Sequence, residues 1–251
     1  FIEIHFGGKL LFDSHGKLYL TVGDGNEIYD SQDLNSFKGK ILRLDVSSLK
    51  LEPEIVAYGI RNPWGVSIDS QDRMFILQCG NISVEAVYLL NNLYSGAPAN
   101  LGWPVFEGPK RAEDLDSISN YYLDIFYWDE GESFNVVEYI EKNAIKPVFY
   151  YNHLPCYSEK NENCDGQTDI YRAAIIGGGI LENPKSEYNF DIFFADYLSQ
   201  ELFSLNFITR ELKIYPIENY LYINSVNVFN AEKNQILTTT NTGRVLILQL
   251  P

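Results

Sequence analysis

A polar turn followed by an apolar strand recurs along this chain of 251 residues. The turn at 13–16 precedes a strand at 17–22, and the turn at 69–72 precedes a strand at 73–77. The same combination of turn and strand recurs at 188–196 and 231–240. Each of these four strands is followed by a second apolar strand, at 40–45, 85–90, 201–205 and 244–248. Recurrence at intervals of roughly 45 to 60 residues is typical of the blades of a β-propeller.

The amino-acid composition agrees with an all-β fold. The chain contains 18 Tyr and 15 Phe, and Val, Ile and Thr fill short runs separated by turn-forming residues. Four such blades do not obviously close a ring, and an open ring leaves sheet edges exposed. The pattern therefore favours one or two blades before Phe1, while a smaller closed ring and a β-sandwich with one long loop are the alternatives.

One interval is too long for a compact blade. Between the strands at 73–77 and 188–196 lies the acidic, aromatic segment 111–141. We interpret it as an inserted loop, partly helical around 134–142, between strands of the third visible blade. Residues 1–251 are expected to form a single propeller domain around it.

Charge and hydropathy exclude two classes of partner. The chain carries 34 acidic and 19 basic residues, a net charge of -15, and its basic residues are scattered singly, which argues against nucleic-acid binding. The longest uncharged apolar stretch, 173–181, contains three glycines and is far shorter than the ~20 residues that span a bilayer. No membrane span is therefore predicted.

The three cysteines do not follow a zinc or haem pattern. Cys156 and Cys164 bracket a polar, turn-forming segment. They form either a small disulfide-closed loop in an oxidising compartment or two free thiols.

Two segments near the start of the chain suggest a polar site. His5 lies two residues before a glycine pair, and a neutral imidazole can abstract a proton near physiological pH. The loop that begins Gly-Asp24-Gly leaves a strand and continues to Gln32, so it could hold Ca²⁺ or orient a polar ligand. The simpler readings are a hydrogen-bonded histidine at a blade edge and a solvated loop with Asx turns.

Two further segments follow the next strands. Arg61 and Asn62 lie between small and rigid residues, and an arginine fork suits carboxylates, although an internal salt bridge is the simpler reading. Gly80 and Asn81 end a strand in a turn shortly before Glu85. Asn81 also begins a formal glycosylation sequon.

In this order, the segments resemble the glucose/sorbosone dehydrogenase family, whose soluble members depend on pyrroloquinoline quinone (PQQ). Its superfamily includes the hedgehog-interacting proteins. The matching motifs are His-x-Gly-Gly-x-Leu at 5–10, Gly-Asp-Gly at 23–25 with Gln-Asp at 32–33, Gly-Lys-Ile-Leu-Arg-Leu-Asp at 39–45, Gly-Ile-Arg-Asn-Pro-Trp at 59–64, Gly-Asn at 80–81 with Glu85, Asn-x-Gly-Trp-Pro at 100–104, Gly-Gly at 177–178 and Phe-Ala-Asp-Tyr at 194–197. Each match alone carries little weight, whereas eight in the same order identify the family.

The resemblance implies a six-bladed β-propeller that oxidises an aldose sugar at its anomeric carbon, with PQQ and Ca²⁺ as cofactors and a separate electron acceptor. His5 matches the catalytic base, and Asp24 matches an acidic residue that orients it. Arg61 and Asn62 match residues that hold the quinone, and Arg61 also matches a catalytic residue that stabilises the negative charge developing on the quinone oxygens. Gln32 is assigned to the same pocket. Gly80 and Asn81 match the Ca²⁺-binding turn, with Glu85 near an acidic position of that loop.

The later blades depart from the family pattern. PQQ carries three carboxylates, yet the turn after Asp196 has an acid, Glu201, where a base is expected. Lys185, Arg172 and Arg210 are the nearest cations, and none occupies a motif position. The alternative is therefore a non-catalytic, hedgehog-interacting-protein-like propeller that binds another protein. Either reading implies a periplasmic or extracellular location and leaves the oligomeric state open.

Overall fold

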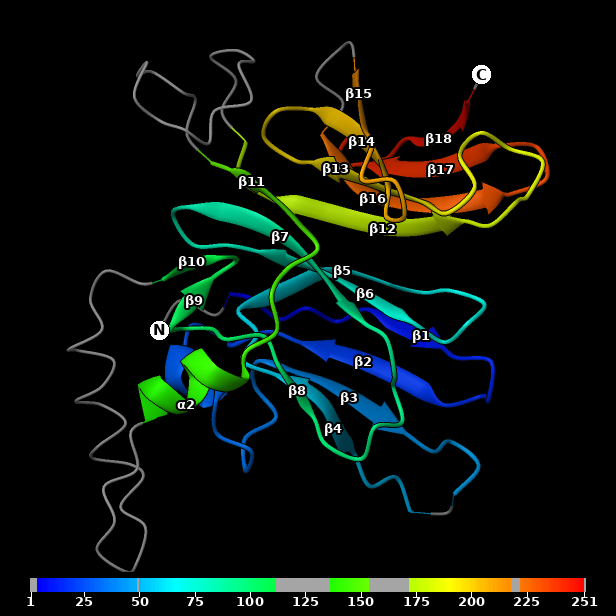
Figure 1. Ribbon diagram of the computed structural model, residues 1–251. Coiled ribbons are helices and arrows are strands. Elements are labelled where there is room, and N and C mark those ends of the chain that lie inside the picture. The colour runs from blue at the N-terminus through cyan, green and yellow to red at the C-terminus, as the bar shows by residue number, and fades with distance from the viewer. Residues whose placement is uncertain (1–3, 49, 112–135, 154–171, 218–221, 251) are drawn as a thin grey trace, which may run out of the picture.

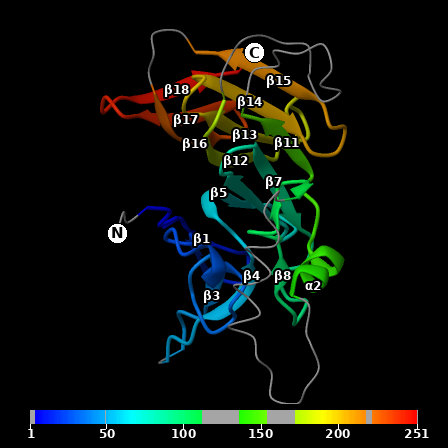
Figure 2. The same cartoon turned by 90° about the vertical axis from the view of Figure 1, so that its left-hand side faces the viewer.

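The computed structural model describes residues 4–48, 50–111, 136–153, 172–217 and 222–250 (Figure 1). Within these residues the strands form four sheets of three to five strands and one two-stranded hairpin. In Figure 1 the first sheet lies at the bottom, the second in the middle, and the third and fourth together at the top. The turned view in Figure 2 shows the same order, with β5 and β7 between the first sheet and the last two. This succession confirms the expected all-β propeller architecture. It differs from the two-sheet arrangement of a β-sandwich, the alternative fold.

The sheets are antiparallel apart from the parallel pair β4 and β8. The first sheet has the order β1 (Leu10–Phe12), β2 (Leu18–Val22), β3 (Lys40–Leu44), β4 (Glu54–Tyr58) and β8 (Ala99–Asn100). The second has β5 (Asn62–Ile68), β6 (Met74–Cys79), β7 (Val84–Leu90) and β11 (Phe149–Asn152). The third has β12 (Ile175–Leu181), β13 (Asp191–Asp196), β14 (Glu201–Asn206) and β15 (Leu212–Pro216). The fourth has β16 (Ile223–Asn230), β17 (Gln235–Thr240) and β18 (Val245–Gln249), and the hairpin joins β9 (Phe106–Glu107) to β10 (Lys110–Arg111).

Successive sheets pack face to face because their middle strands are apolar on both sides. In β6, Met74 and Ile76 pack with the first sheet, whereas Phe75 and Leu77 pack with the third. Side chains alternate across a strand, so a continuous apolar run supplies two cores at once. β13 repeats the arrangement, with Phe194 in the core shared with the second sheet and Phe193 in the core shared with the fourth.

The first strands of neighbouring sheets contact one another, β1 with β5, β5 with β12, and β12 with β16. Glycines allow this approach. A Cβ atom on Gly65 would lie 1.8 Å from the carbonyl oxygen of Gly177, and one on Gly177 would lie 2.6 Å from Cβ of Val226. Atoms cannot approach this closely, so the inner strands reach contact distance only without side chains at these positions.

The strands that flank the inserted segment belong to a different sheet from the one expected. The chain between β7 and β11 contains it, and these strands pair within the second sheet, whereas the sequence pattern had placed it in the third. Residues 112–135 lie outside the described part, and α2 (Val136–Asn143) occupies the region expected to be helical. Cys156 and Cys164 also lie outside the described residues. Among the residues that are described, no helix is long and apolar enough to cross a membrane.

Buried tyrosines predict alkaline unfolding. Burial raises the pKa values of Tyr19, Tyr88 and Tyr151. The unfolded chain therefore loses these protons near pH 10 while the folded protein keeps them, and each such tyrosine lowers the free energy of unfolding by about 1.4 kcal/mol per pH unit above that point. Lys40 acts oppositely, because burial lowers its pKa to about 8 from 10.5 and this favours the folded state as pH rises between those values.

We therefore expect stability to fall steeply above pH 10.5, measured by urea denaturation at a series of pH values. Tyr88→Phe is a suitable variant because the Tyr88 hydroxyl makes no hydrogen bond in the described part of the chain. Above pH 10.5, the free energy of unfolding of this variant should fall less steeply with pH, by about 1.4 kcal/mol per pH unit, the contribution of one buried tyrosine. An unchanged slope would mean that Tyr88 ionises normally in the folded protein.

Candidate functional site

His5 and Asp24 form a hydrogen-bonded pair beside the first sheet. His5 Nδ1 lies 2.7 Å from Asp24 Oδ1, and Asp24 is fully buried while the His5 side chain keeps 11% of its surface exposed. A carboxylate that accepts from Nδ1 orients the ring and leaves Nε2 able to accept a proton. The structure thus brings together the two residues assigned to proton transfer.

The backbone of His5 lies in close contact with the residues that follow β2. A Cβ atom on Gly23 would lie 1.9 Å from the His5 carbonyl oxygen, so only glycine allows the two chains to meet here. His5 itself has φ 60°, in the left-handed region that non-glycine residues rarely adopt. The glycine before Asp24 therefore fixes the distance between the histidine and its carboxylate.

Trp103 connects the carboxylate to Arg61. Its indole Nε1 donates to Asp24 Oδ2 at 3.0 Å, and the Arg61 guanidinium lies 5.8 Å from the centre of its ring, within the range of a cation–π contact. The Asp24 amide also donates to the Arg61 carbonyl oxygen at 2.7 Å. The local sequence does not reveal this connection, because Trp103 lies 79 positions from Asp24.

Gln32 supports the Trp103 loop. Its amide nitrogen donates to Asn100 Oδ1 at 3.0 Å and to the Trp103 carbonyl oxygen at 2.6 Å, while its oxygen accepts from Asn100 at 2.9 Å. The side chain is buried. Gln32 was expected to bind the cofactor, but these contacts engage both ends of its amide within the protein.

The Arg61 side chain faces the turn after β6. Its Nη1 donates to the carbonyl oxygen of Gly80 and, at 3.3 Å, to that of Cys79, and Nη2 lies 3.3 Å from Asn81 Oδ1. Three oxygens therefore converge on one cation, and the guanidinium remains half-buried. The neighbouring Asn62 is also half-buried, and its side chain makes no hydrogen bond to any described residue.

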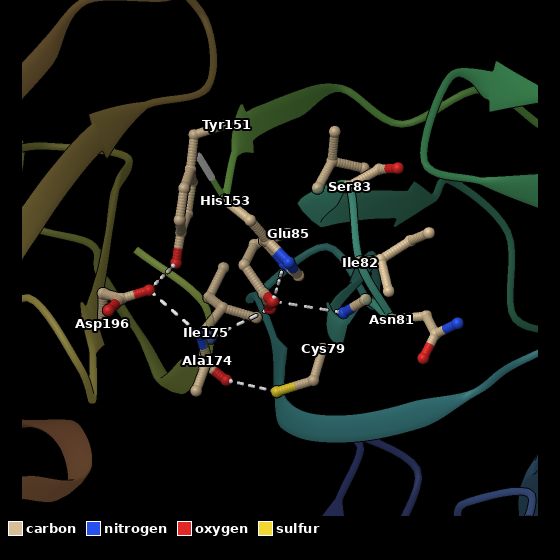
Figure 3. A network of polar contacts seen from close by, with 12 residues as sticks. Cys79, Asn81, Ile82, Ser83, Glu85, Tyr151, His153, Ala174, Ile175 and Asp196 are labelled. Carbon is tan, nitrogen blue, oxygen red and sulfur yellow. Dashed lines mark hydrogen bonds and ion pairs between the residues drawn. The ribbon is translucent and has the colours of Figure 1, made fainter. Parts of the chain in front are cut away.

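Glu85 lies beside this turn and holds it through the Gly80 amide (Figure 3). Its carboxylate accepts from His153 Nε2 at 2.6 Å and from the amides of Ile175 at 3.0 Å and Gly80 at 3.3 Å. Burial raises the pKa of the Glu85 carboxyl, and the contact with His153 opposes that rise. Both oxygens are engaged within the protein, so at this turn a metal would have to use the oxygens that Arg61 now contacts, those of Cys79, Gly80 and Asn81.

The third sheet contributes a closed ion pair. Arg172 Nε and Nη2 donate to the two carboxylate oxygens of Glu201 at 2.6 and 3.0 Å, and both side chains are buried. Arg172 was a candidate counter-charge for the cofactor and Glu201 the unexpected acid. The structure pairs them with each other in the bidentate geometry that arginine and carboxylate favour.

The metal-binding residue types do not gather in one place. Within the described ranges, no three His, Cys, Asp or Glu side chains are grouped as a metal site would require. The donor set that suits a hard cation such as Ca²⁺ consists of the carbonyl oxygens of Cys79 and Gly80, which already face the positive charge of Arg61. This turn fits a cation, provided that Arg61 turns away from it.

Comparison with known proteins gives relatives of two kinds. The chain is 29% identical to the HIPL1 protein of Arabidopsis thaliana over 74% of this chain and 31% of that protein. It is 27% identical to the aldose sugar dehydrogenase YliI of Escherichia coli over 51% of this chain and 38% of that protein. The chain thus spans about a third of the length of these relatives.

A solved structure has the same fold. The PQQ-bound aldose sugar dehydrogenase from Streptomyces coelicolor superimposes with a TM-score of 0.63 at 17% identity, covering 98% of this chain and 62% of that one. The family model described as glucose/sorbosone dehydrogenase matches residues 2–134, which carry His5, Asp24, Arg61 and the turn at 79–81. The chain is therefore a member of the glucose/sorbosone dehydrogenase family.

Proposed function

We propose that this propeller forms the catalytic face of a PQQ- and Ca²⁺-dependent dehydrogenase that oxidises an aldose sugar at its anomeric carbon. The observation that carries the proposal is the pair formed by partly exposed His5 and buried Asp24, 2.7 Å apart and linked through Trp103 to Arg61. A base, its orienting carboxylate and a cation on one face suit the removal of a hydroxyl proton next to an anionic acceptor.

Each of these residues has a distinct task. His5 Nε2 takes the proton of the anomeric hydroxyl, and Asp24 stabilises the imidazolium that forms. Arg61 and Asn62 would hold the quinone, and the carbonyl oxygens of Cys79 and Gly80 would bind Ca²⁺ once Arg61 has turned away from them. When bound, the quinone supplies the acceptor for the hydride that leaves the sugar, and a separate electron acceptor completes the cycle. We place this activity in the periplasm or outside the cell.

One observation favours a second function. The buried Arg172–Glu201 pair neutralises the cation that the third sheet could offer to a carboxylate of PQQ. A propeller that lacks this counter-charge fits the non-catalytic alternative, in which the same face binds another protein. The HIPL1 relative is compatible with this alternative.

A titration separates the two functions. The protein is titrated with PQQ in Ca²⁺ and in a calcium chelator, and the quinone absorbance is followed before and after an aldose is added. We expect saturable, Ca²⁺-dependent binding and bleaching by the sugar, because Arg61 and a Ca²⁺ ion held at the turn would both favour an anionic quinone. If a folded sample does not bind PQQ at high concentration, the enzymatic proposal is wrong and the protein-binding function takes its place.

A further inference from the structure

One carboxylate oxygen organises the turn that faces Arg61. Glu107, in β9, places Oε1 within 2.7 to 3.0 Å of four consecutive backbone nitrogens, those of Asn81, Ile82, Ser83 and Val84. Glu107 is buried. The hairpin that contains it lies next to β7 (Figure 1). A buried carboxylate with several amide donors is a strong anchor, because each hydrogen bond to a charged acceptor exceeds a neutral one.

The anchor gives the turn two chemically different sides. Glu107 collects the amides of 81–84, and Glu85 collects the amide of Gly80 at 3.3 Å, so five successive N–H groups point to carboxylates. The carbonyl oxygens of Cys79 and Gly80 instead accept from Arg61. Amide and carbonyl of a peptide unit point in opposite directions, so holding the N–H groups presents the oxygens to the cation.

We propose that Glu107 is a positioning residue for this site. By binding the amide of Asn81, it holds the carbonyl oxygen of Gly80 toward Arg61 in the cofactor-free protein, while Glu85 holds the carbonyl oxygen of Cys79 through the Gly80 amide. The oxygen of Gly80 in turn sets the direction of the guanidinium. The inference depends on the proposed function only for what Arg61 does afterwards. The orientation of the turn and of Arg61 can be tested without any cofactor.

The packing around the turn leaves little freedom for another arrangement. A Cβ atom on Gly80 would lie 1.8 Å from the Val84 carbonyl oxygen and 2.6 Å from Glu107 Oε1. A Cβ atom on Gly108 would lie 2.6 Å from Cγ2 of Val84. The turn and β9 therefore meet at two glycines, which lets a single carboxylate oxygen reach all four amides.

The test compares Glu107→Gln with a matched control, Asp69→Asn. Asp69 is also a buried carboxylate that holds a turn, accepting from the amides of Gln71 and Arg73, but it lies at the other end of β5 and β6. Hydrogen exchange of the amides at 81–84 and modification of Arg61 by phenylglyoxal are measured by mass spectrometry on the cofactor-free protein. Arg43, which pairs with Glu54, is the internal reference for modification.

We expect Glu107→Gln to accelerate exchange at 81–84 by about tenfold or more, because charge-assisted hydrogen bonds are lost. Arg61 should become more reactive while Arg43 does not change. In Asp69→Asn, the exchange rates at 81–84 and the reactivity of Arg61 should equal those of the parent protein. This should hold even if Asp69→Asn lowers thermal stability as much as Glu107→Gln does. Unchanged Arg61 reactivity in Glu107→Gln, or the same increase in both variants, would overturn the inference.

A PQQ titration of the parent and of Glu107→Gln distinguishes this inference from the proposed function. Weaker PQQ binding in the variant supports both. Absence of binding in the parent overturns the proposed enzyme, while the exchange and modification results still decide the role of Glu107. Glu107→Asp provides a second variant, because the shorter carboxylate keeps the charge and should restore part of the protection.

Discussion

Replacing His5 by alanine should lower kcat for sugar-dependent dye reduction by about 10²- to 10⁴-fold, the range that general-base catalysis contributes. His5 is partly exposed and its ring is oriented by buried Asp24, so the substitution removes the proton acceptor without opening a core. The PQQ affinity of the variant should stay close to that of the parent, because Arg61 and the turn at 79–81 are unaffected. Steady-state kinetics with a quinone titration measures both.

The matched control is His15→Ala. His15 also lies beside a carboxylate, with Nδ1 3.1 Å from Asp72 Oδ2, but its side chain is 62% exposed. It lies in the turn between β1 and β2, at the other end of β2 from Asp24. It should retain full activity. If His5→Ala binds PQQ and oxidises the sugar at the parent rate, another group removes the proton and the role given to His5 is wrong.

Replacing Glu201 by glutamine should lower the free energy of unfolding by about 3–5 kcal/mol, the range typical of removing one partner of a buried ion pair. Arg172 would keep its charge in a buried position while losing the two contacts to the carboxylate. Chemical denaturation at neutral pH measures the loss. The double variant Arg172→Met with Glu201→Leu removes both charges of this pair and should be more stable than Glu201→Gln alone.

The control is an exposed ion pair on the surface, formed by Lys213 and Glu187. Their atoms lie 3.0 Å apart with the Glu187 side chain 59% exposed, so Glu187→Gln should change stability by about 1 kcal/mol or less. Equal losses for Glu187→Gln and Glu201→Gln would show that the Arg172 pair does not support the third sheet.

The fold could be predicted because its evidence is local. The turn before β2 and the apolar run of β6 signal strands within a few residues, and their recurrence indicates blades. The sheet that receives the insertion was assigned wrongly because strand pairing is a long-range property. β11 pairs with β7 across the whole inserted segment, and spacing alone does not show which strand closes a sheet.

The site was only partly visible in the sequence for the same reason. His5, Asp24 and Arg61 follow family motifs, so their residue types and order were recognisable. Glu107 was missed because its four contacts join positions 23 to 26 residues apart through backbone amides, which leave no trace in residue types. Gln32 looked available for a ligand, but a pattern does not show that Asn100 already occupies its amide.

The glycine contacts between the inner strands have a consequence for how this chain can diverge. Gly65 cannot gain a side chain while the Gly177 oxygen lies beneath it, and Gly177 cannot do so while Val226 retains its volume. A substitution at one position is thus tolerated only after compensating changes in a neighbouring blade, which is a case of epistasis between distant parts of the gene. Neutral drift should therefore accumulate in the outer strands and loops, leaving these blade-to-blade contacts as the slowest part of the molecule to evolve.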